Sequence, residues 1–195
     1  MFKGIVADIG TIINTSNCHT EDQVFHIKTE NLFSINKGDS ISCAGVCLTV
    51  INVAKDVFAV QVSQETFKAT NLNTWAVGKK INLEQAMRLS DRIDGHLVQG
   101  HVDGTVKILA INQHLNSHEI KLSYPRELTK FIAKKGSVVL DGVSLTVNST
   151  IYQSLTVNII PYTWKNTTFQ YSKIGDFLNL EVDMIARYLN QLMQN

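Results

Sequence analysis

The chain has 195 residues and a mass of 21.8 kDa, which fits either one domain or two small ones. Hydrophobic residues make up 44% and charged residues 18%, with only two prolines, so the composition is that of a globular protein and excludes a disordered chain. The net charge of +1 provides no basic surplus to neutralise phosphates, which argues against a nucleic-acid partner.

Neither a membrane segment nor an export signal is expected. The first ten residues, MFKGIVADIG, contain no long apolar stretch, and no apolar run elsewhere approaches the ~20 residues of a membrane span. The three cysteines, Cys18, Cys43 and Cys47, are an odd number at spacings that do not suit zinc. They predict free thiols and a cytoplasmic protein.

Most of the predicted elements are short strands. Residues 40–43 and 46–50 flank a turn at Ala44 and Gly45, residues 57–62 are a β-branched run, and residues 77–84 indicate a turn followed by a strand. A second turn, at Asp141 and Gly142, has the dipeptide favoured where both central residues need a positive φ. Residues 154–160 form another β-branched run.

Two regions indicate helices. Residues 125–134 are helix-like, with a counterpart expected in residues 30–37. In the C-terminal tail, residues 183–193 lack Gly and Pro, and their apolar residues fall at positions 184/185, 188/189 and 192/193, a stripe at helical spacing. A short helix needs a packing partner, which is either its own barrel or copies of itself in an oligomer.

The chain repeats itself at an offset of 97 residues. Residues 45–50 (GVCLTV) fall on residues 142–147 (GVSLTV), and residues 82–84 (NLE) fall on residues 179–181 (NLE). Between residues 40 and 84 there are 14 identities in 45 positions without a gap, where chance would give about three. The starts of the two copies match at an offset of 96, with Gly4 on Gly100. The repeat is therefore a duplication, with only two long copies.

Roughly six short strands in each ~90-residue copy predict a small closed barrel. The expected fold is all-β, with two homologous six-stranded β-barrels related by the 97-residue offset and a C-terminal α-helix. The expected domains are residues 1–96, residues 97–185 and an oligomerisation helix over residues 186–195.

Differences between the copies indicate where the two have specialised. His101 replaces Ile5, Ser144 replaces Cys47, and Tyr162 replaces Glu65. Histidine can move a proton near neutral pH, although an exposed histidine at the start of a strand is an equal alternative. The Cys47 thiol can attack an electrophilic carbon, but spacing alone favours a small buried hydrophobe.

No metal site is expected. His96 and His101 lie five residues apart in a Gly-rich segment, but no further Cys, His or acidic cluster completes a coordination sphere. No phosphate-binding Gly-rich loop opens a helix either. The polar atoms of a ligand must then be bound by hydroxyl and backbone groups of the protein, which suits a heterocycle with a polyol tail. The candidate hydroxyls are those of Thr49, Thr66, Ser144, Thr146 and Thr163.

Taken in order, the motifs resemble riboflavin synthase, the trimeric lumazine-dismutating type, over essentially the whole chain. The matching segments are the start of the chain over residues 1–6 (MFKGIV), residues 45–50, Glu65 and Thr66, residues 95–102 (GHLVQGHV), Lys135 and Gly136, residues 141–147 (DGVSLTV) and residues 160–163 (IPYT). Each segment is weak alone, but together on a duplicated chain they are specific.

The resemblance implies that two molecules of 6,7-dimethyl-8-ribityllumazine exchange a four-carbon unit, giving riboflavin and 5-amino-6-(D-ribitylamino)uracil. It implies a transferase that uses no metal, redox cofactor or nucleotide. Each barrel would bind one lumazine, and a homotrimer would form through the C-terminal helix. The active site would then lie between barrels of neighbouring subunits, and association with lumazine synthase is a further expectation.

The resemblance also implies the site residues. His101 would assist proton transfer at the 7-methyl group of one lumazine with support from Ser40, and Cys47, or a water that it positions, would add to C7 of the other. The expected substrate-binding residues are Gly4, Ile5, Val6, Cys47, Leu48, Thr49, Gln61, Val62, Ser63, Gln64, Glu65, Thr66, Gly100, His101, Val102, Lys135, Ser144, Leu145, Thr146, Ile160, Pro161, Tyr162, Thr163, Trp164 and Lys165.

Three alternatives remain at this stage. A non-catalytic lumazine- or flavin-binding fluorescent protein could use the same duplicated barrel. A reductase flavin barrel is disfavoured because no nucleotide-binding α/β segment accompanies it. A structural or interaction module would be supported by the apolar tail alone.

Overall fold

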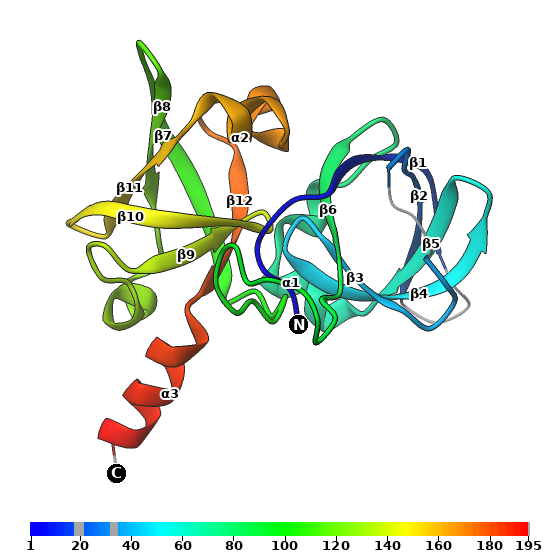
Figure 1. The fold of residues 1–195 in the computed structure, drawn as a ribbon, viewed down its shortest axis with the longest axis horizontal. Helices are drawn as coiled ribbons and strands as arrows, with labels where there is room; N and C mark the ends of the chain where they lie inside the picture. The colour runs from blue at the N-terminus through cyan, green and yellow to red at the C-terminus, as the bar shows by residue number, and fades with distance from the viewer. Residues whose placement is uncertain (18–21, 32–34, 195) are drawn as a thin grey trace.

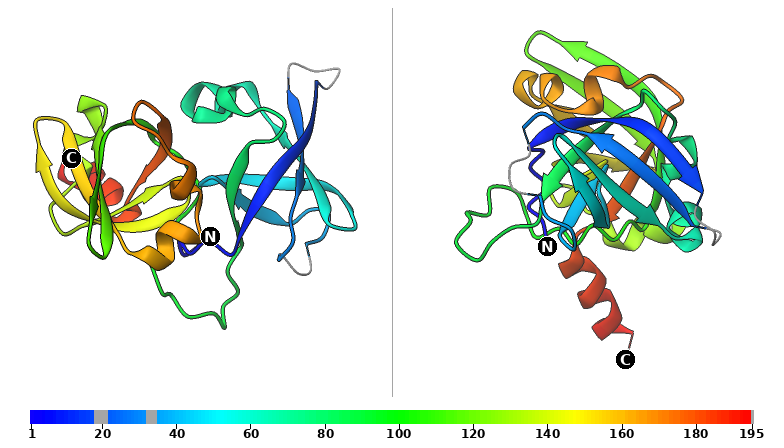
Figure 2. Two further views of the ribbon diagram at one scale, coloured as in Figure 1. Left: turned by 90° about the horizontal axis from the view of Figure 1, so that it is seen from above. Right: turned by 90° about the vertical axis from the view of Figure 1, so that its right-hand side faces the viewer.

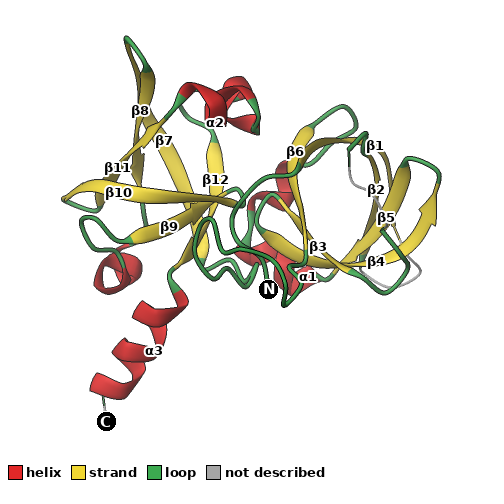
Figure 3. Ribbon diagram, viewed as in Figure 1, coloured by secondary structure: helices red, strands yellow, loops and turns green. Residues whose placement is uncertain are grey.

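The computed structural model describes residues 1–17, 22–31 and 35–194. Two barrels lie side by side, and a C-terminal helix projects from the second (Figure 1). Strands form both barrels, while helices occur in short connections and at the C-terminus (Figure 3).

The two barrels have the same topology. The first contains β1 (Asp8–Asn17), β2 (Gln23–Lys28), β3 (Ser40–Cys43), β4 (Val46–Ala54), β5 (Val57–Val62) and β6 (Lys80–Gln85), closed in the order β1-β2-β5-β4-β3-β6. The second contains β7 (Gly104–His114), β8 (Ser117–Ser123), β9 (Ser137–Leu140), β10 (Val143–Ile151), β11 (Ser154–Ile159) and β12 (Phe177–Val182), closed in the equivalent order. The predicted fold class, two six-stranded barrels and a C-terminal helix, is confirmed.

The predicted turns between β3 and β4 and between β9 and β10 are also confirmed. Ala44 and Gly45 have φ values of 47° and 80°, and Asp141 and Gly142 have values of 43° and 83°. Both central residues of each turn are therefore left-handed, as a tight two-residue hairpin requires. Side chains alternate along β4, since Leu48 is buried between the half-buried Cys47 and the exposed Thr49.

Several short helices connect the strands: α1 (Gln64–Ala69), η1 (Asn71–Thr74), η2 (Arg126–Phe131), α2 (Pro161–Lys165) and η3 (Thr168–Tyr171). The helix expected over residues 125–134 corresponds to the 3₁₀ helix η2. Its expected counterpart is wrong for residues 30–31 and 35–37, which are not helical; residues 32–34 lie outside the described part of the chain. Helices α1 and α2 were not predicted, because each is only about one turn long and its signals are caps such as Ser63.

The C-terminal helix α3 (Met184–Met193) extends away from the barrels (Figure 2). None of its residues is buried. Its apolar stripe is exposed along its length, at Ile185, Tyr188, Leu189, Leu192 and Met193. The expectation that this stripe packs on its own barrel is therefore wrong. Within the described residues, no helix has the length and apolar character needed to cross a membrane.

Two asparagines at equivalent positions join the barrels. The Asn82 side chain donates to the Asp141 carbonyl at 2.8 Å and accepts from the Thr168 amide at 2.8 Å. Asn179 reciprocates, donating to the Ala44 carbonyl at 2.8 Å and accepting from the Asn71 amide. These reciprocal contacts are those of a two-fold interface, here within one chain. They explain why the NLE motif is identical in both copies.

Candidate functional site

The leading segment of each copy crosses to the other barrel. The Gly4 carbonyl accepts a hydrogen bond from the Ser144 amide on β10, and the Gly100 carbonyl accepts one from the Cys47 amide on β4, both at 2.8 Å. Beyond these contacts, Val6 packs against the core of the second barrel and Val102 against that of the first. The predicted residues therefore group into two composite regions, each formed by both copies.

The first composite region contains β4 and the leading segment of the second copy. Cys47 is half-buried there and His101, the residue after Gly100, is exposed. Ser40 pairs directly with Thr49 across β3 and β4. It also lines a cavity of about 310 Å³, with Ile35, Asn36, Asp39, Ile41, Gln85, Ala86 and Arg88. The structure thus brings together a thiol and the backbone that carries the predicted proton-transfer histidine.

The second composite region contains β10 and the leading segment of the first copy. The Ser144 hydroxyl lies 2.7 Å from Nδ1 of His96, and no described residue makes an equivalent contact with the Cys47 side chain. Burial lowers the pKa of His96, against the opposing influence of Asp183, so the neutral imidazole is favoured near neutral pH. Lys135 is exposed and held at a φ of 70°. The two regions therefore match in backbone but differ in their reactive side chains.

A carboxylate holds each leading segment in place. Glu84 on β6 accepts from the amides of Lys3 and Gly4 at 2.8 and 3.0 Å. Glu181 on β12 accepts from the amides of Gln99, Gly100 and His101 at 2.8, 2.8 and 3.1 Å. Burial raises the pKa of both carboxyls, that of Glu84 to about 7, although the amide hydrogen bonds act in the opposite direction. These two glutamates are the identical last residues of the NLE motif.

Replacing Gly100 with alanine tests how closely the crossing segment approaches β4. Gly100 has a φ of 77°, and an added Cβ would lie 2.7 Å from Cβ of Cys47. Strain and overpacking together are expected to lower the unfolding free energy by about 3 kcal/mol. The control Gly175→Ala has a similar φ of 98° but meets nothing within 4 Å, so it isolates the strain of about 1 kcal/mol. Equal losses in urea denaturation would contradict the close packing.

The remaining predicted residues lie along α1, α2 and the strands that precede them. The predicted residues of this group that are exposed are Gln61, Ser63, Gln64, Glu65, Ile160, Pro161, Tyr162 and Lys165, while Thr66, Thr163 and Trp164 are half-buried. Leu48 and Val62 instead have side chains in the core of the first barrel, 5% and 0% exposed. Only the backbone of these two residues is available to a ligand.

Sequence reasoning missed several residues that build the regions. His96 is expected only as part of the segment over residues 95–102 and as a weak metal candidate, not as a partner of Ser144. His118 carries no expectation, and it lies on β8 with its ring stacked on that of Trp164, the ring centroids being 3.7 Å apart. Glu84 and Glu181 are identified from the sequence only as identities of the repeat. Their position at the end of the strand motif NLE in both copies is a signal for a structural role, because a glutamate in a buried strand is rarely left without a partner.

Cys43 lies in the core of the first barrel. Burial raises the pKa of its thiol, which is consistent with an unreactive core residue. Among the residues described, no group of three or more His, Cys, Asp or Glu is arranged to hold a metal. A groove of about 550 Å³ between the barrels is lined partly by Asn71, Lys79 and Asp141, with no predicted site residue among its described lining.

Comparison with known proteins identifies the domain and its relatives. A model of the lumazine binding domain matches residues 3–86 and again residues 99–183. Riboflavin synthase of Photobacterium leiognathi is 37% identical over 196 residues, covering 100% of this chain and 89% of that protein. Riboflavin synthase of Bacillus subtilis (strain 168) is 39% identical over 193 residues, covering 99% of this chain and 90% of that protein. Riboflavin synthase of Brucella abortus (strain 2308) is 39% identical over 200 residues, covering 100% of this chain and 98% of that protein.

Solved structures share the fold. The crystal structure of LumP complexed with riboflavin has a TM-score of 0.87 at 23% identity, covering 94% of this chain and 100% of that chain. The complex of LumP with 6,7-dimethyl-8-(1'-D-ribityl) lumazine has a TM-score of 0.84 at 23% identity, covering 94% and 99%. The two domain matches and the nearly full-length identities of 37–39% show that this chain belongs to the riboflavin synthase family and carries the lumazine binding domain twice.

Proposed function

We propose that this chain converts two molecules of 6,7-dimethyl-8-ribityllumazine into riboflavin and 5-amino-6-(D-ribitylamino)uracil, one molecule donating four carbons and the other accepting them. Membership of the riboflavin synthase family supports the reaction. The observation that carries the proposal is the pair of composite regions. Two barrels of the same fold suit the binding of two identical lumazine molecules. The different side chains at the equivalent positions Cys47 and Ser144 suit the different roles of the donor and the acceptor molecule. Orienting two reactants can contribute ~7–11 kcal/mol toward the barrier.

His101 is proposed to assist removal of a proton from the 7-methyl group of one lumazine, with support from Ser40. Cys47, or a water that it positions, is proposed to add to C7 of the other molecule. The exposure of His101 supports access to a ligand, and the half-buried position of Cys47 beside the same crossing segment supports a shared region. Hydroxyl groups such as those of Thr49 and Thr146, both exposed, are proposed to bind ring or ribityl oxygens.

A turnover assay with purified protein and lumazine tests this proposal. Replacing His101 with glutamine is expected to lower kcat by roughly 10²- to 10⁴-fold, because a positioned proton-transfer group contributes that much. Cys47→Ser, which keeps a polar group of similar size, separates addition by sulfur from binding alone. His114→Gln, at an exposed position at the end of β7, is the matched control. Near-wild-type rates for both His101→Gln and Cys47→Ser would remove the assigned roles.

A non-catalytic chromophore-binding protein is the alternative, because the LumP structures share the fold and contain bound lumazine or riboflavin. The same assay separates the two. Riboflavin formation from lumazine as the sole substrate supports the enzyme, whereas stoichiometric lumazine binding without turnover supports the alternative.

We also propose a homotrimer assembled through α3, with active sites shared between subunits. The exposed apolar stripe of α3 supports an interface, because contiguous apolar surface on a short helix is otherwise costly. A cytoplasmic location is supported by the two described cysteines, Cys43 and Cys47, which are both free thiols. Association with lumazine synthase stays a prediction.

A further inference from the structure

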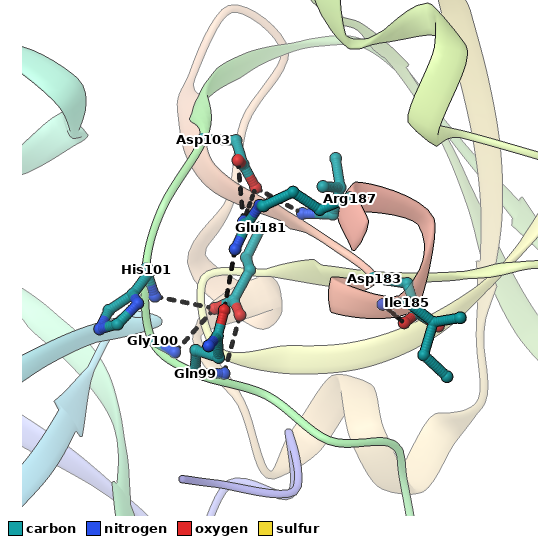
Figure 4. Close-up of polar contacts among 9 residues, drawn as sticks. Gln99, Gly100, His101, Asp103, Glu181, Asp183, Ile185 and Arg187 are labelled. Atoms are coloured by element: carbon teal, nitrogen blue, oxygen red, sulfur yellow. Dashed lines mark hydrogen bonds and ion pairs between the residues drawn. The ribbon is translucent and has the colours of Figure 1, made fainter. Parts of the chain in front are cut away.

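Helix α3 is fixed to its own chain through Arg187. Its guanidinium donates to both carboxylate oxygens of Asp103, at 2.9 and 2.8 Å, and to Oε1 of Gln99 at 2.8 Å (Figure 4). The ion pair is partly shielded, with side-chain exposures of 30% for Arg187 and 18% for Asp103. Both bonds to Asp103 come from Nη2 and the bond to Gln99 comes from Nη1, and this partly shielded pair is more strongly oriented than an exposed one.

The two partners of Arg187, Gln99 and Asp103, lie two residues before and two residues after His101 in the sequence. The amides of Gln99, Gly100 and His101 all donate hydrogen bonds to the Glu181 carboxylate (Figure 4). Asp103 is held further, because its amide donates to the Leu180 carbonyl and its carboxylate accepts from the Val182 amide, each at 2.8 Å. The segment from residue 99 to residue 103 is thus held by β12 through its backbone and the Asp103 carboxylate, and by α3 through the side chains of Gln99 and Asp103.

The first copy has the backbone half of this arrangement only. Glu84 holds Lys3 and Gly4 as Glu181 holds Gln99 and Gly100. At the positions equivalent to Gln99 and Asp103, however, the first copy has Lys3 and Ala7. Ala7 keeps the backbone hydrogen bond to Leu83 that corresponds to that of Asp103 to Leu180, but it offers no carboxylate. The additional contact with Arg187 therefore belongs to the copy that carries the histidine.

The orientation of α3 keeps this contact separate from the apolar stripe. At about 100° per residue, Arg187 lies on the opposite side of the helix from Ile185, Leu189 and Leu192. One face of α3 therefore contacts the segment that carries His101, while the other is free to meet further chains.

We infer that Arg187 is a positioning residue, which fixes the backbone of the His101 segment and makes the geometry of that segment depend on the orientation of α3. The inference rests on the proposed function, in which His101 acts on the substrate. Among the described residues, the Arg187 side chain donates hydrogen bonds to Gln99 and Asp103, and its charge opposes the raised pKa of Glu181, which holds the same segment, so Arg187 acts through that segment.

The test compares Arg187→Met, Arg187→Lys and the control Arg92→Met in the full-length protein. Arg187→Met is expected to lower kcat by roughly 10- to 100-fold with a smaller change in KM, since a misplacement of about 1 Å at a reacting group has that effect. Lysine can pair with Asp103 but cannot bridge Gln99 at the same time, so Arg187→Lys is expected to recover part of the loss. Arg92, whose side chain is 93% exposed, is expected to be replaceable without effect.

Hydrogen exchange provides the readout that does not depend on turnover. In Arg187→Met, the amides of Gln99, Gly100 and His101 are expected to exchange about tenfold faster, because their segment opens more often. Native mass measurement is expected to find the same assembly as in the wild type. If the wild-type protein made no riboflavin, the proposed function would fail, and the exchange result would still decide whether Arg187 fixes the segment.

A double variant shows whether the effect passes through Asp103. Asp103→Asn keeps an oxygen for the Val182 amide but loses the charge, so Arg187→Met combined with Asp103→Asn is expected to be no slower than the worse single variant. Amide exchange and kcat of Arg187→Met within twofold of the wild type would overturn the inference. The inference would also be overturned if Arg187→Met lost activity only because the assembly dissociated, while amide exchange stayed unchanged.

Discussion

Replacing Leu192 with glutamate is expected to dissociate the proposed trimer into monomers and to lower riboflavin formation on the order of 100-fold or more. Leu192 is 71% exposed within the apolar stripe of α3. Burying a leucine in an interface contributes about 1.5–3 kcal/mol, and burying an unpaired carboxylate in its place is strongly unfavourable. Activity is expected to fall with assembly because the proposed sites, shared between subunits, would be incomplete in a monomer.

The substitution is more informative than deletion of residues 186–195, because the deletion also removes Arg187. Gln194→Glu is the matched control, since it adds the same charge at the C-cap of α3, at a helical angle opposite the stripe. Analytical ultracentrifugation and the lumazine assay measure the two consequences together. A Leu192→Glu monomer with full turnover would refute the shared site, and an unchanged assembly would refute the role of the stripe.

Replacing Asp141 with asparagine is expected to flatten the dependence of stability on pH. The Asp141 carboxyl lies between the barrels, accepting from the Asn179 amide at 2.7 Å and from the Asn71 side chain. Burial raises its pKa to about 7, with Lys79 opposing and Asp176 reinforcing the shift. No such group exists at the equivalent position in the first copy, which is Ala44.

The direction follows from proton binding. Between about pH 4 and pH 7 the folded chain keeps a proton on Asp141 that the unfolded chain has lost, so the unfolding free energy of the wild type falls as pH rises through this interval. The raised pKa of Glu84, also to about 7, acts in the same direction. Asp141→Asn removes one of these contributions, so stability relative to the wild type is expected to improve by roughly 3–4 kcal/mol from pH 4 to pH 7.

Urea denaturation at several pH values and one fixed chain concentration measures this difference. Asp56→Asn is the control, because the Asp56 side chain is 51% exposed and pairs only with Lys28. Its pH dependence is expected to match that of the wild type. Parallel curves for Asp141→Asn and the wild type would show that the Asp141 carboxyl has the same pKa in the folded and unfolded chain, which would contradict the prediction.

The fold could be predicted from the sequence because the duplication makes each signal appear twice. The turns at Ala44 and Asp141 and the β-branched strands follow local rules that one sequence reveals. The short helices α1 and α2 could not be predicted in the same way, since about one turn of helix depends on caps and on packing against the barrel end.

The candidate site was less predictable. The repeat alone does not indicate that Gly4 lies against the strand of Ser144 and Gly100 against that of Cys47. The structure shows both contacts, because the leading segments cross. Contacts such as His96 with Ser144, and Arg187 with Asp103, join residues 48 and 84 positions apart. Neither pair follows a helical or strand period, so periodicity could not indicate them.

The crossing of the two leading segments also indicates how a chain with a single copy would have to assemble. Each barrel is completed by a segment that belongs, in sequence, to the other copy, as Val6 and Val102 show. A chain of one copy could satisfy the same contacts only by exchanging its leading segment with a second molecule. The two halves of this chain are thus arranged like the subunits of a segment-exchanged dimer that have been joined end to end. The covalent connection keeps them at a high effective concentration and allows their sequences to diverge.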